Sequence, residues 1–201
     1  MKHIFNQGKD ATKPTLLLLH GTGGNENDLL PIAEQIDRDA SVLSVRGNIL
    51  ENGMPRFFKR LKEGVFDEED LIFRTEELKS FLDKAANEYE FNRQNIIAIG
   101  YSNGANIAAS LLFHYENALK GAILHHPMVP RRGIELPDLQ GTSVFIAAGK
   151  KDPLCPPKEA EDLHMLFNKA NVETELFWLE GGHQLVAEEV EAAKKWYEKI
   201  I

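Results

Sequence analysis

The chain has 201 residues, 43% of them hydrophobic, and its formal net charge is −8 at pH 7. This length predicts a single domain, residues 1–201, with enough apolar residues for a sizeable core. The negative charge argues against nucleic acid as a partner, because contacts to phosphate need a basic face. No apolar stretch is long enough to span a bilayer and the first residues do not resemble a signal peptide, so no membrane insertion is expected.

Short apolar runs alternate with longer amphipathic ones, which predicts an α/β fold with a mostly parallel sheet and helices on both faces. Strands are expected at residues 15–20, 41–46, 95–100, 121–125, 143–148 and 174–179. Helices are expected at residues 26–38, 68–90, 103–116, 157–170 and 186–200. No gap between the strands has room for a large cap domain, so we expect a site that is open or shielded only by loops.

The first expected strand ends in a glycine-rich loop, H-G-T-G-G at residues 20–24. Loops of the H-G-x-G-G type supply a backbone N–H to a tetrahedral oxyanion, so the N–H of Thr22 is predicted to be one such donor. A loop of this kind can also cradle phosphate, but neither common phosphate-binding glycine motif is present. His20 is expected to form hydrogen bonds within the loop, because no partner lies at metal-ligand spacing.

The segment at residues 47–67 is expected to be a long loop. It contains the apolar residues Met54, Phe57 and Phe58 beside several basic ones. Two interpretations are open: a hydrophobic wall for the substrate with a basic rim for an anionic group, or a loop that packs its aromatic rings onto the core. The basic residues concerned are Arg56, Lys59, Arg60 and Lys62.

His126 and Met128, which follow the expected strand 121–125, are further candidates for the pocket wall. His125 and His126 have no third ligand at a sensible spacing, so we expect them to pack at the end of the strand and predict no metal site.

Ser102 is the centre of G-Y-S-N-G at residues 100–104, between an expected strand and an expected helix. A serine on such a sharp turn projects its hydroxyl at the carboxyl edge of the sheet. The five letters alone are also compatible with a glycine-rich connection without chemistry. If Ser102 is a nucleophile, the N–H of Asn103, at the start of the helix, is the second oxyanion donor.

A base and an orienting acid follow in the order serine, acid, histidine. Asp152 comes just after the expected strand 143–148, and His183 follows two glycines after the strand 174–179. In isolation Asp152 reads as the start of an Asp-Pro turn. Together with Ser102 upstream and His183 downstream, it is the predicted acid. His183 would accept the Ser102 proton, and Asp152 would fix the imidazole tautomer.

Four blocks, in this order along the chain, resemble the small carboxylesterase/phospholipase family of α/β-hydrolases: L-L-L-L-H-G-T-G-G (16–24), G-Y-S-N-G-A-N (100–106), G-K-K-D-P (149–153) and G-G-H (181–183). Within that family, R-G-N (46–48), N-G-M-P-R-F-F (52–58) and H-H-P (125–127) resemble the MhqD-type bacterial hydrolases. The resemblance implies hydrolysis of esters or thioesters without a metal or organic cofactor. It further suggests a link to quinone or other electrophile stress.

We therefore expect a serine esterase that acts on small to medium carboxylic esters. The nearer alternatives are an acyl-protein thioesterase, a lysophospholipase or dienelactone-hydrolase-like chemistry, the last of which commonly uses cysteine in place of Ser102. The farther alternative is a non-catalytic binding protein, which would usually lack one of the three catalytic residues. The single cysteine, Cys155, fits a reducing cytoplasm. A homodimer is compatible with the sequence, which does not determine the oligomeric state.

Overall fold

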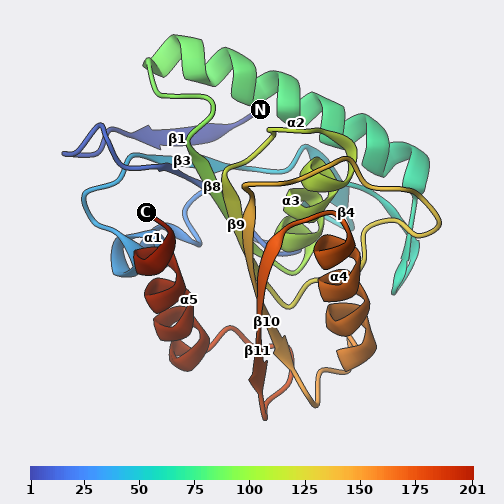
Figure 1. The fold of residues 1–201 in the computed structure, drawn as a ribbon. Coiled ribbons are helices and arrows are strands. Elements are labelled where there is room, and N and C mark those ends of the chain that lie inside the picture. The colour runs from blue at the N-terminus through green and yellow to red at the C-terminus, as the bar shows by residue number, and fades with distance from the viewer.

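The computed structural model describes all 201 residues, and its centre is a seven-stranded sheet (Figure 1). The strands lie in the order β1-β3-β2-β8-β9-β10-β11, and all neighbours are parallel except β1, which pairs antiparallel with β3. Their bounds are β1 His3–Asn6, β2 Thr15–Leu19, β3 Val42–Val45, β8 Ile96–Tyr101, β9 Gly121–His125, β10 Ser143–Gly149 and β11 Glu173–Leu179. The predicted, mostly parallel sheet is confirmed. The short edge strand β1 was not predicted.

The β2 strand shows why these runs form the centre of the sheet. Leu17 and Leu19 pack into one layer of the core, and Leu16 and Leu18 pack into the other. Side chains alternate between the faces of a strand, so a continuous apolar run suits a strand that is covered on both sides.

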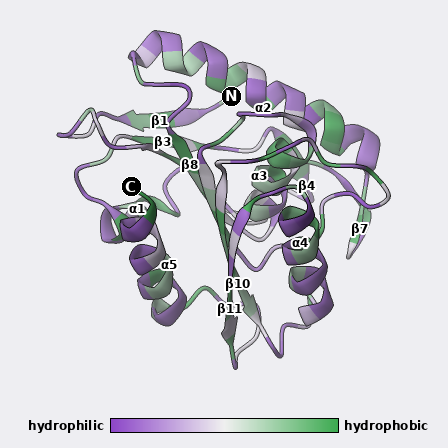
Figure 2. Cartoon of the chain, in the orientation of Figure 1, coloured by the Kyte–Doolittle hydropathy of each residue, from purple (hydrophilic) through white to green (hydrophobic).

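Helices cover both faces of the sheet, as predicted (Figure 1). The helices α1 (Leu30–Ile36) and α5 (Ala187–Ile200) pack on one face. On the other face lie α2 (Glu68–Tyr89), α3 (Asn103–His114) and α4 (Pro157–Lys169). Figure 2 shows hydrophilic residues along the outer sides of α2, α4 and α5. The apolar stripes of these helices therefore belong to the core.

The segment at residues 47–67 differs from the predicted loop. It forms two short hairpins, β4 (Ile49–Glu51) with β5 (Met54–Arg56) and β6 (Arg60–Lys62) with β7 (Val65–Phe66). The first hairpin turns at Asn52-Gly53, where both residues have positive φ. Asn-Gly is the strongest short signal for a two-residue hairpin turn, so the β4–β5 hairpin could have been predicted from the sequence.

The carboxyl ends of β8, β9, β10 and β11 lie along one edge of the sheet, because these four strands are parallel neighbours. The loops that leave β10 and β11 meet at Gly149, where a Cβ atom would run into the backbone of Gly181 and Gly182. This close approach brings the segments after the two strands together. None of the helices is both long and apolar enough to cross a membrane.

Candidate active site

Ser102 lies in a strained turn between β8 and α3. Its φ is +51°, in the left-handed region that non-glycine residues rarely adopt. The turn is held by a hydrogen bond from the Ser102 N–H to the carbonyl of His125, at 2.9 Å. It also depends on Gly104, because a Cβ atom there would run into the backbone of Leu19 and His20. The strain is thus supported by the packing of α3 against β2, and it presents the hydroxyl at the sheet edge.

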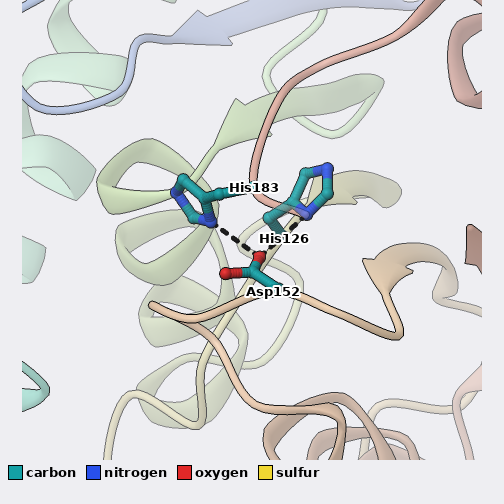
Figure 3. Close-up of side chains that lie close together, drawn as sticks. All are labelled: His126, Asp152 and His183. Atoms are coloured by element: carbon teal, nitrogen blue, oxygen red, sulfur yellow. Dashed lines mark hydrogen bonds and ion pairs between the residues drawn. The ribbon is translucent and has the colours of Figure 1, made fainter. Parts of the chain in front are cut away.

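The structure brings Ser102, His183 and Asp152 into hydrogen-bond contact in the predicted order. His183 Nε2 lies 2.9 Å from Ser102 Oγ, and His183 Nδ1 lies 2.7 Å from Asp152 Oδ2. Figure 3 shows the second of these contacts. The Asp152 side chain is fully buried, whereas that of His183 is 15% exposed. This geometry suits a base that reaches a nucleophile while an acid orients it from behind.

Asp152 is held as a carboxylate by several donors. Its Oδ1 accepts hydrogen bonds from the backbone N–H groups of Leu154 and Cys155, at 2.8 and 2.9 Å. Burial by itself would raise the pKa of Asp152, but the Cys155 N–H and the bond from His183 lower it below its usual range. The carboxylate therefore stays charged at neutral pH and can accept a hydrogen bond from His183 Nδ1.

Tyr101, the residue before Ser102, holds the loop that carries His183. Its hydroxyl donates a hydrogen bond to the His183 carbonyl, at 2.7 Å. Burial, together with the charges of Glu189 and Asp152, raises the pKa of Tyr101 to about 12. The phenol consequently remains a donor throughout the neutral range.

Thr22 and Asn103, the predicted oxyanion donors, line the same cavity as Ser102. The Thr22 N–H has no hydrogen-bond acceptor in the protein. Asn103 is the first residue of α3, where a backbone N–H has no acceptor within the helix. The loop that carries Thr22 is fixed by His20, whose Nδ1 contacts the Gly21 carbonyl at 2.6 Å and whose Nε2 accepts from the Gly47 N–H at 3.1 Å.

The cavity beside Ser102 has a volume of about 300 Å³. Besides the residues already named, its wall contains the following side chains: Arg56, Arg60, Glu63, Phe66, Asn106, Met128, Leu154 and Cys155. Burial and the nearby Asp152 and Glu159 charges raise the pKa of the Cys155 thiol, so this cysteine is a poor nucleophile.

Of the five side chains proposed for the pocket wall, only Met128 lines this cavity. Phe57 and Phe58 are 1% and 0% exposed and belong to the hydrophobic core, so the core-packing interpretation holds for them. Met54 is 39% exposed and lies beside Gly23 instead. His126 is fully buried behind Asp152. The aromatic residue that the segment 47–67 does contribute is Phe66, from the second hairpin.

Two of the four basic residues of the segment, Arg56 and Arg60, line the cavity, whereas Lys59 and Lys62 do not. Arg56 is 3% exposed, donates to the Thr22 hydroxyl, and pairs with Glu51 at 3.1 Å. Arg60 pairs with the same Glu51 at 2.9 Å. Asn103 lines the same cavity, and its side-chain amide nitrogen is buried without a hydrogen-bond partner. The cavity therefore offers several donors to a bound molecule.

A buried polar network lies behind Asp152, and its key residue was missed in the sequence. Glu189, in the first turn of α5, is fully buried and contacts both His125 and His126. A signal for it does exist. Glu189 precedes Ala193 by four residues and Trp196 by seven, so it lies on the apolar face of the helix, where a carboxylate needs a partner.

One group of side chains is spaced closely enough to hold a metal ion: a ring nitrogen of His126, a carboxylate oxygen of Asp152 and a ring nitrogen of His183 lie within 4.8 Å of one another. Both histidines hydrogen-bond to the same oxygen, Asp152 Oδ2, at 3.1 and 2.7 Å (Figure 3). A ring nitrogen that donates a hydrogen bond to the carboxylate carries a proton and has no free lone pair for a metal ion. The arrangement therefore fits a hydrogen-bond network better than a metal centre.

Comparison with known proteins places this site in a family. The model of the dienelactone hydrolase family matches residues 46–199, a range that contains Ser102, Asp152 and His183. The chain belongs to the dienelactone hydrolase family. It is also 61% identical to "Putative hydrolase MhqD" of Bacillus subtilis (strain 168) over 201 residues, which is 100% of both chains.

Solved structures agree with this placement. The chain is similar to the Bacillus cereus carboxylesterase, with 69% identity, a TM-score of 0.99, and coverage of 100% of this chain and 95% of that one. It is also similar to YahD, solved with malic acid, with 33% identity, a TM-score of 0.94, and coverage of 100% and 99%. The family member described here has the α/β-hydrolase fold and is a carboxylic ester hydrolase. The expectation of a carboxylesterase-type enzyme is confirmed.

Proposed function

We propose that this hydrolase is a serine esterase that cleaves small to medium carboxylic esters through an acyl-enzyme on Ser102. His183 is the base and Asp152 is the orienting acid. The observation that carries the proposal is the run of hydrogen bonds from Ser102 Oγ to His183 Nε2 and from His183 Nδ1 to Asp152 Oδ2, at 2.9 and 2.7 Å. A serine hydroxyl is a weak nucleophile, and a base at this distance activates it.

In the acylation step, Ser102 Oγ attacks the carbonyl carbon of the ester as His183 Nε2 takes the hydroxyl proton. The carbonyl oxygen becomes an oxyanion, for which the N–H groups of Thr22 and Asn103 are the donors. The intermediate then collapses, and the leaving alcohol receives the proton from His183. In the second step, water attacks the acyl-enzyme by the same route and releases the acid. The scheme uses no metal or organic cofactor.

The cavity supports a preference for compact substrates. Its volume of about 300 Å³ is at the small end of ligand pockets. Phe66, Met128 and Leu154 offer apolar contacts to a short acyl or aromatic group, whereas Arg56 and Arg60 offer donors to an anionic or carbonyl group. The relative YahD was solved with malic acid, a small dicarboxylic acid, which is compatible with a compact polar ligand.

Labelling with a fluorophosphonate probe tests the nucleophile. The wild type should be labelled, and Ser102→Ala should not. A matched control is Ser110→Ala. Ser110 is a buried serine of α3, the helix that follows Ser102, and its hydroxyl bonds to the Thr75 hydroxyl at 2.7 Å and does not line the cavity. The proposal is contradicted if Ser102→Ala is labelled or if the wild type is not labelled. The second outcome favours a non-catalytic binding protein.

A series of p-nitrophenyl esters, from acetyl to palmitoyl, tests the substrate class. We expect kcat/KM to rise over the first few carbons and then to fall. A profile that still rises at palmitoyl contradicts the compact pocket and favours an acyl-protein thioesterase or a lysophospholipase.

The link to quinone or electrophile stress, and a cytoplasmic location, are also part of this proposal. The first is supported by the resemblance to MhqD-type hydrolases, and the second by the lone Cys155. A strain without the protein should grow more slowly than its parent in the presence of quinones. Equal growth contradicts the stress link and leaves the esterase proposal intact.

A further inference from the structure

His126 occupies an unusual position at the end of β9. Its φ is +52°, and its N–H donates to the Ala147 carbonyl of β10 at 2.7 Å. A non-glycine residue adopts this backbone conformation only when its surroundings enforce it. The side chain is fully buried, and Figure 3 shows its ring and that of His183 both directed at the same oxygen of Asp152.

Both nitrogens of the His126 ring face a carboxylate. Nδ1 lies 3.1 Å from Asp152 Oδ2, and Nε2 lies 3.2 Å from Glu189 Oε1. Both carboxylates are fully buried. A neutral imidazole donates from one nitrogen only, whereas an imidazolium donates from both.

The remaining contacts of the two carboxylates show which of their oxygens already have other hydrogen-bond partners. Glu189 Oε1 also accepts from the backbone N–H of Val186 at 2.9 Å, and Glu189 Oε2 contacts His125 Nδ1 at 2.6 Å. Asp152 accepts from two backbone N–H groups and from His183. Each oxygen that faces His126 therefore already has another donor, which suits an ionised oxygen and not a hydroxyl.

We propose that His126 and Glu189 are positioning residues of the hydrolytic site, with His126 held as an imidazolium between the carboxylates of Asp152 and Glu189. This inference rests on the proposed function of Asp152 as the acid that orients His183. The imidazolium donates to Asp152 Oδ2, the same oxygen that His183 Nδ1 contacts, so it limits the orientations that this carboxylate can take. Glu189 supplies the charge that keeps the imidazolium in the interior.

The direction of the pKa shifts agrees with this arrangement. Burial by itself would lower the pKa of His126, but the hydrogen bond and charge of Glu189 and the charge of Asp152 raise it. Burial would likewise raise the pKa of Glu189, yet the bonds from His125 and His126 lower it to about 2. The other titratable rings close to His126 are His183 and Tyr101, with ring centroids at 5.3 and 6.0 Å.

The charges define what the network does for His183. With Asp152 and Glu189 negative and His126 positive, the buried group has a net charge of −1, the same as a lone aspartate. Without the imidazolium, two negative charges would remain buried near His183. Nearby negative charge favours the protonated form of a histidine, so loss of the imidazolium is expected to change the pH profile of the reaction.

The protonation of His126 can be measured directly on the wild-type protein. We expect NMR of ¹⁵N-histidine-labelled protein at pH 8 to show protons on both ring nitrogens of His126, with the signal assigned by its loss in His126→Gln. In Glu189→Gln, one of these nitrogens should lose its proton at the same pH. A neutral His126 in the wild type at pH 8 would overturn the proposal. Because this measurement needs no substrate, its outcome is independent of whether Ser102 is the nucleophile.

The pH profile of kcat/KM distinguishes a positioning role from a merely structural one. In His126→Gln the acidic limb should move to higher pH by about one unit, because two buried carboxylates then act on His183. In the double variant His126→Gln, Glu189→Gln one carboxylate is removed, so the limb should move back toward the wild-type position. Coupled groups titrate together, so the whole profile is compared and not a single assigned value.

Tyr197→Phe is the matched control for this experiment. Tyr197 lies on α5, as Glu189 does, and its buried hydroxyl donates to Asp37 at 3.0 Å. This variant should lower the melting temperature without moving the pH profile. If His126→Gln behaves in the same way, with lower stability and an unmoved profile, His126 is only structural and the proposal fails.

Discussion

The carboxyl edge of the sheet and the segment at residues 47–67 both contribute to the cavity, but in different ways. Ser102, Asp152 and His183 follow directly from β8, β10 and β11, whose backbones are paired to their neighbours. The 47–67 segment lies outside the main sheet, in two small hairpins of its own. Groups that react need a rigid frame, whereas the wall that selects a substrate can be built on a connection whose length and shape are free to vary.

The hairpin segment is nevertheless anchored. Phe57 and Phe58, between the two hairpins, are buried in the core, and the Phe57 N–H donates to the Asn103 side chain at 2.7 Å. The two regions therefore meet at Asn103, the residue after Ser102. Within the segment, Phe57 and Phe58 belong to the core, whereas Arg56, Arg60 and Phe66 line the cavity.

Removal of the Ser102 hydroxyl should have the largest effect. Ser102→Ala should lower kcat for a p-nitrophenyl ester by roughly 10⁴-fold or more, because we propose that this hydroxyl forms the acyl-enzyme. Its thermal unfolding and circular dichroism should match the wild type, since the side chain removed is small. Turnover near the wild-type rate in this variant would contradict the proposal that Ser102 is the nucleophile.

The anchor of the hairpin segment should affect stability more than catalysis. Phe58→Ala removes a fully buried ring and should lower the free energy of unfolding by about 3–5 kcal/mol. Chemical denaturation measures this change. Phe66→Ala, at the cavity wall, is the control and should cost less stability. An unchanged stability of Phe58→Ala would show that the segment is not anchored through the core.

The basic rim should act on the binding of charged substrates. Arg60→Gln should raise KM about tenfold for an ester that carries a carboxylate, because one charge-assisted hydrogen bond is lost. Its KM for a neutral ester of the same size should be unchanged. Lys59→Gln is the matched control, since Lys59 is exposed and does not line the cavity. Equal effects of the two variants on KM would assign the change to overall charge and not to Arg60.

The smallest effect should come from the length of the acyl chain. Each methylene that fits the cavity should lower the activation free energy that sets kcat/KM by about 0.8 kcal/mol, and each that protrudes should change it little. In Phe66→Ala the optimum should move to longer chains, because the wall recedes. The acyl series measured on Phe66→Ala and on the wild type gives this shift directly. The same optimum in both proteins would show that the second hairpin does not determine the preferred acyl length.

Much of this site was predictable because it depends on order along the chain. In a parallel sheet the strands end at the same edge, so a serine, an aspartate and a histidine that each follow a strand are expected to gather there. The structure brings Ser102, Asp152 and His183 together in that way. Apart from β1, the strands of the main sheet and its helices could likewise be predicted, because their apolar residues repeat at the period of the structure they form.

The sequence by itself determined the fold class, the order of the elements and which residues could meet at the sheet edge. Only the tertiary structure decided that Phe66 faces the cavity while Phe57 and Phe58 face the core, because short hairpins carry too few residues for a readable alternation. It also decided that Glu189 reaches His126, a residue 63 positions earlier in the chain. That contact depends on how α5 packs against the sheet, and the packing of two distant elements leaves no local pattern in the sequence.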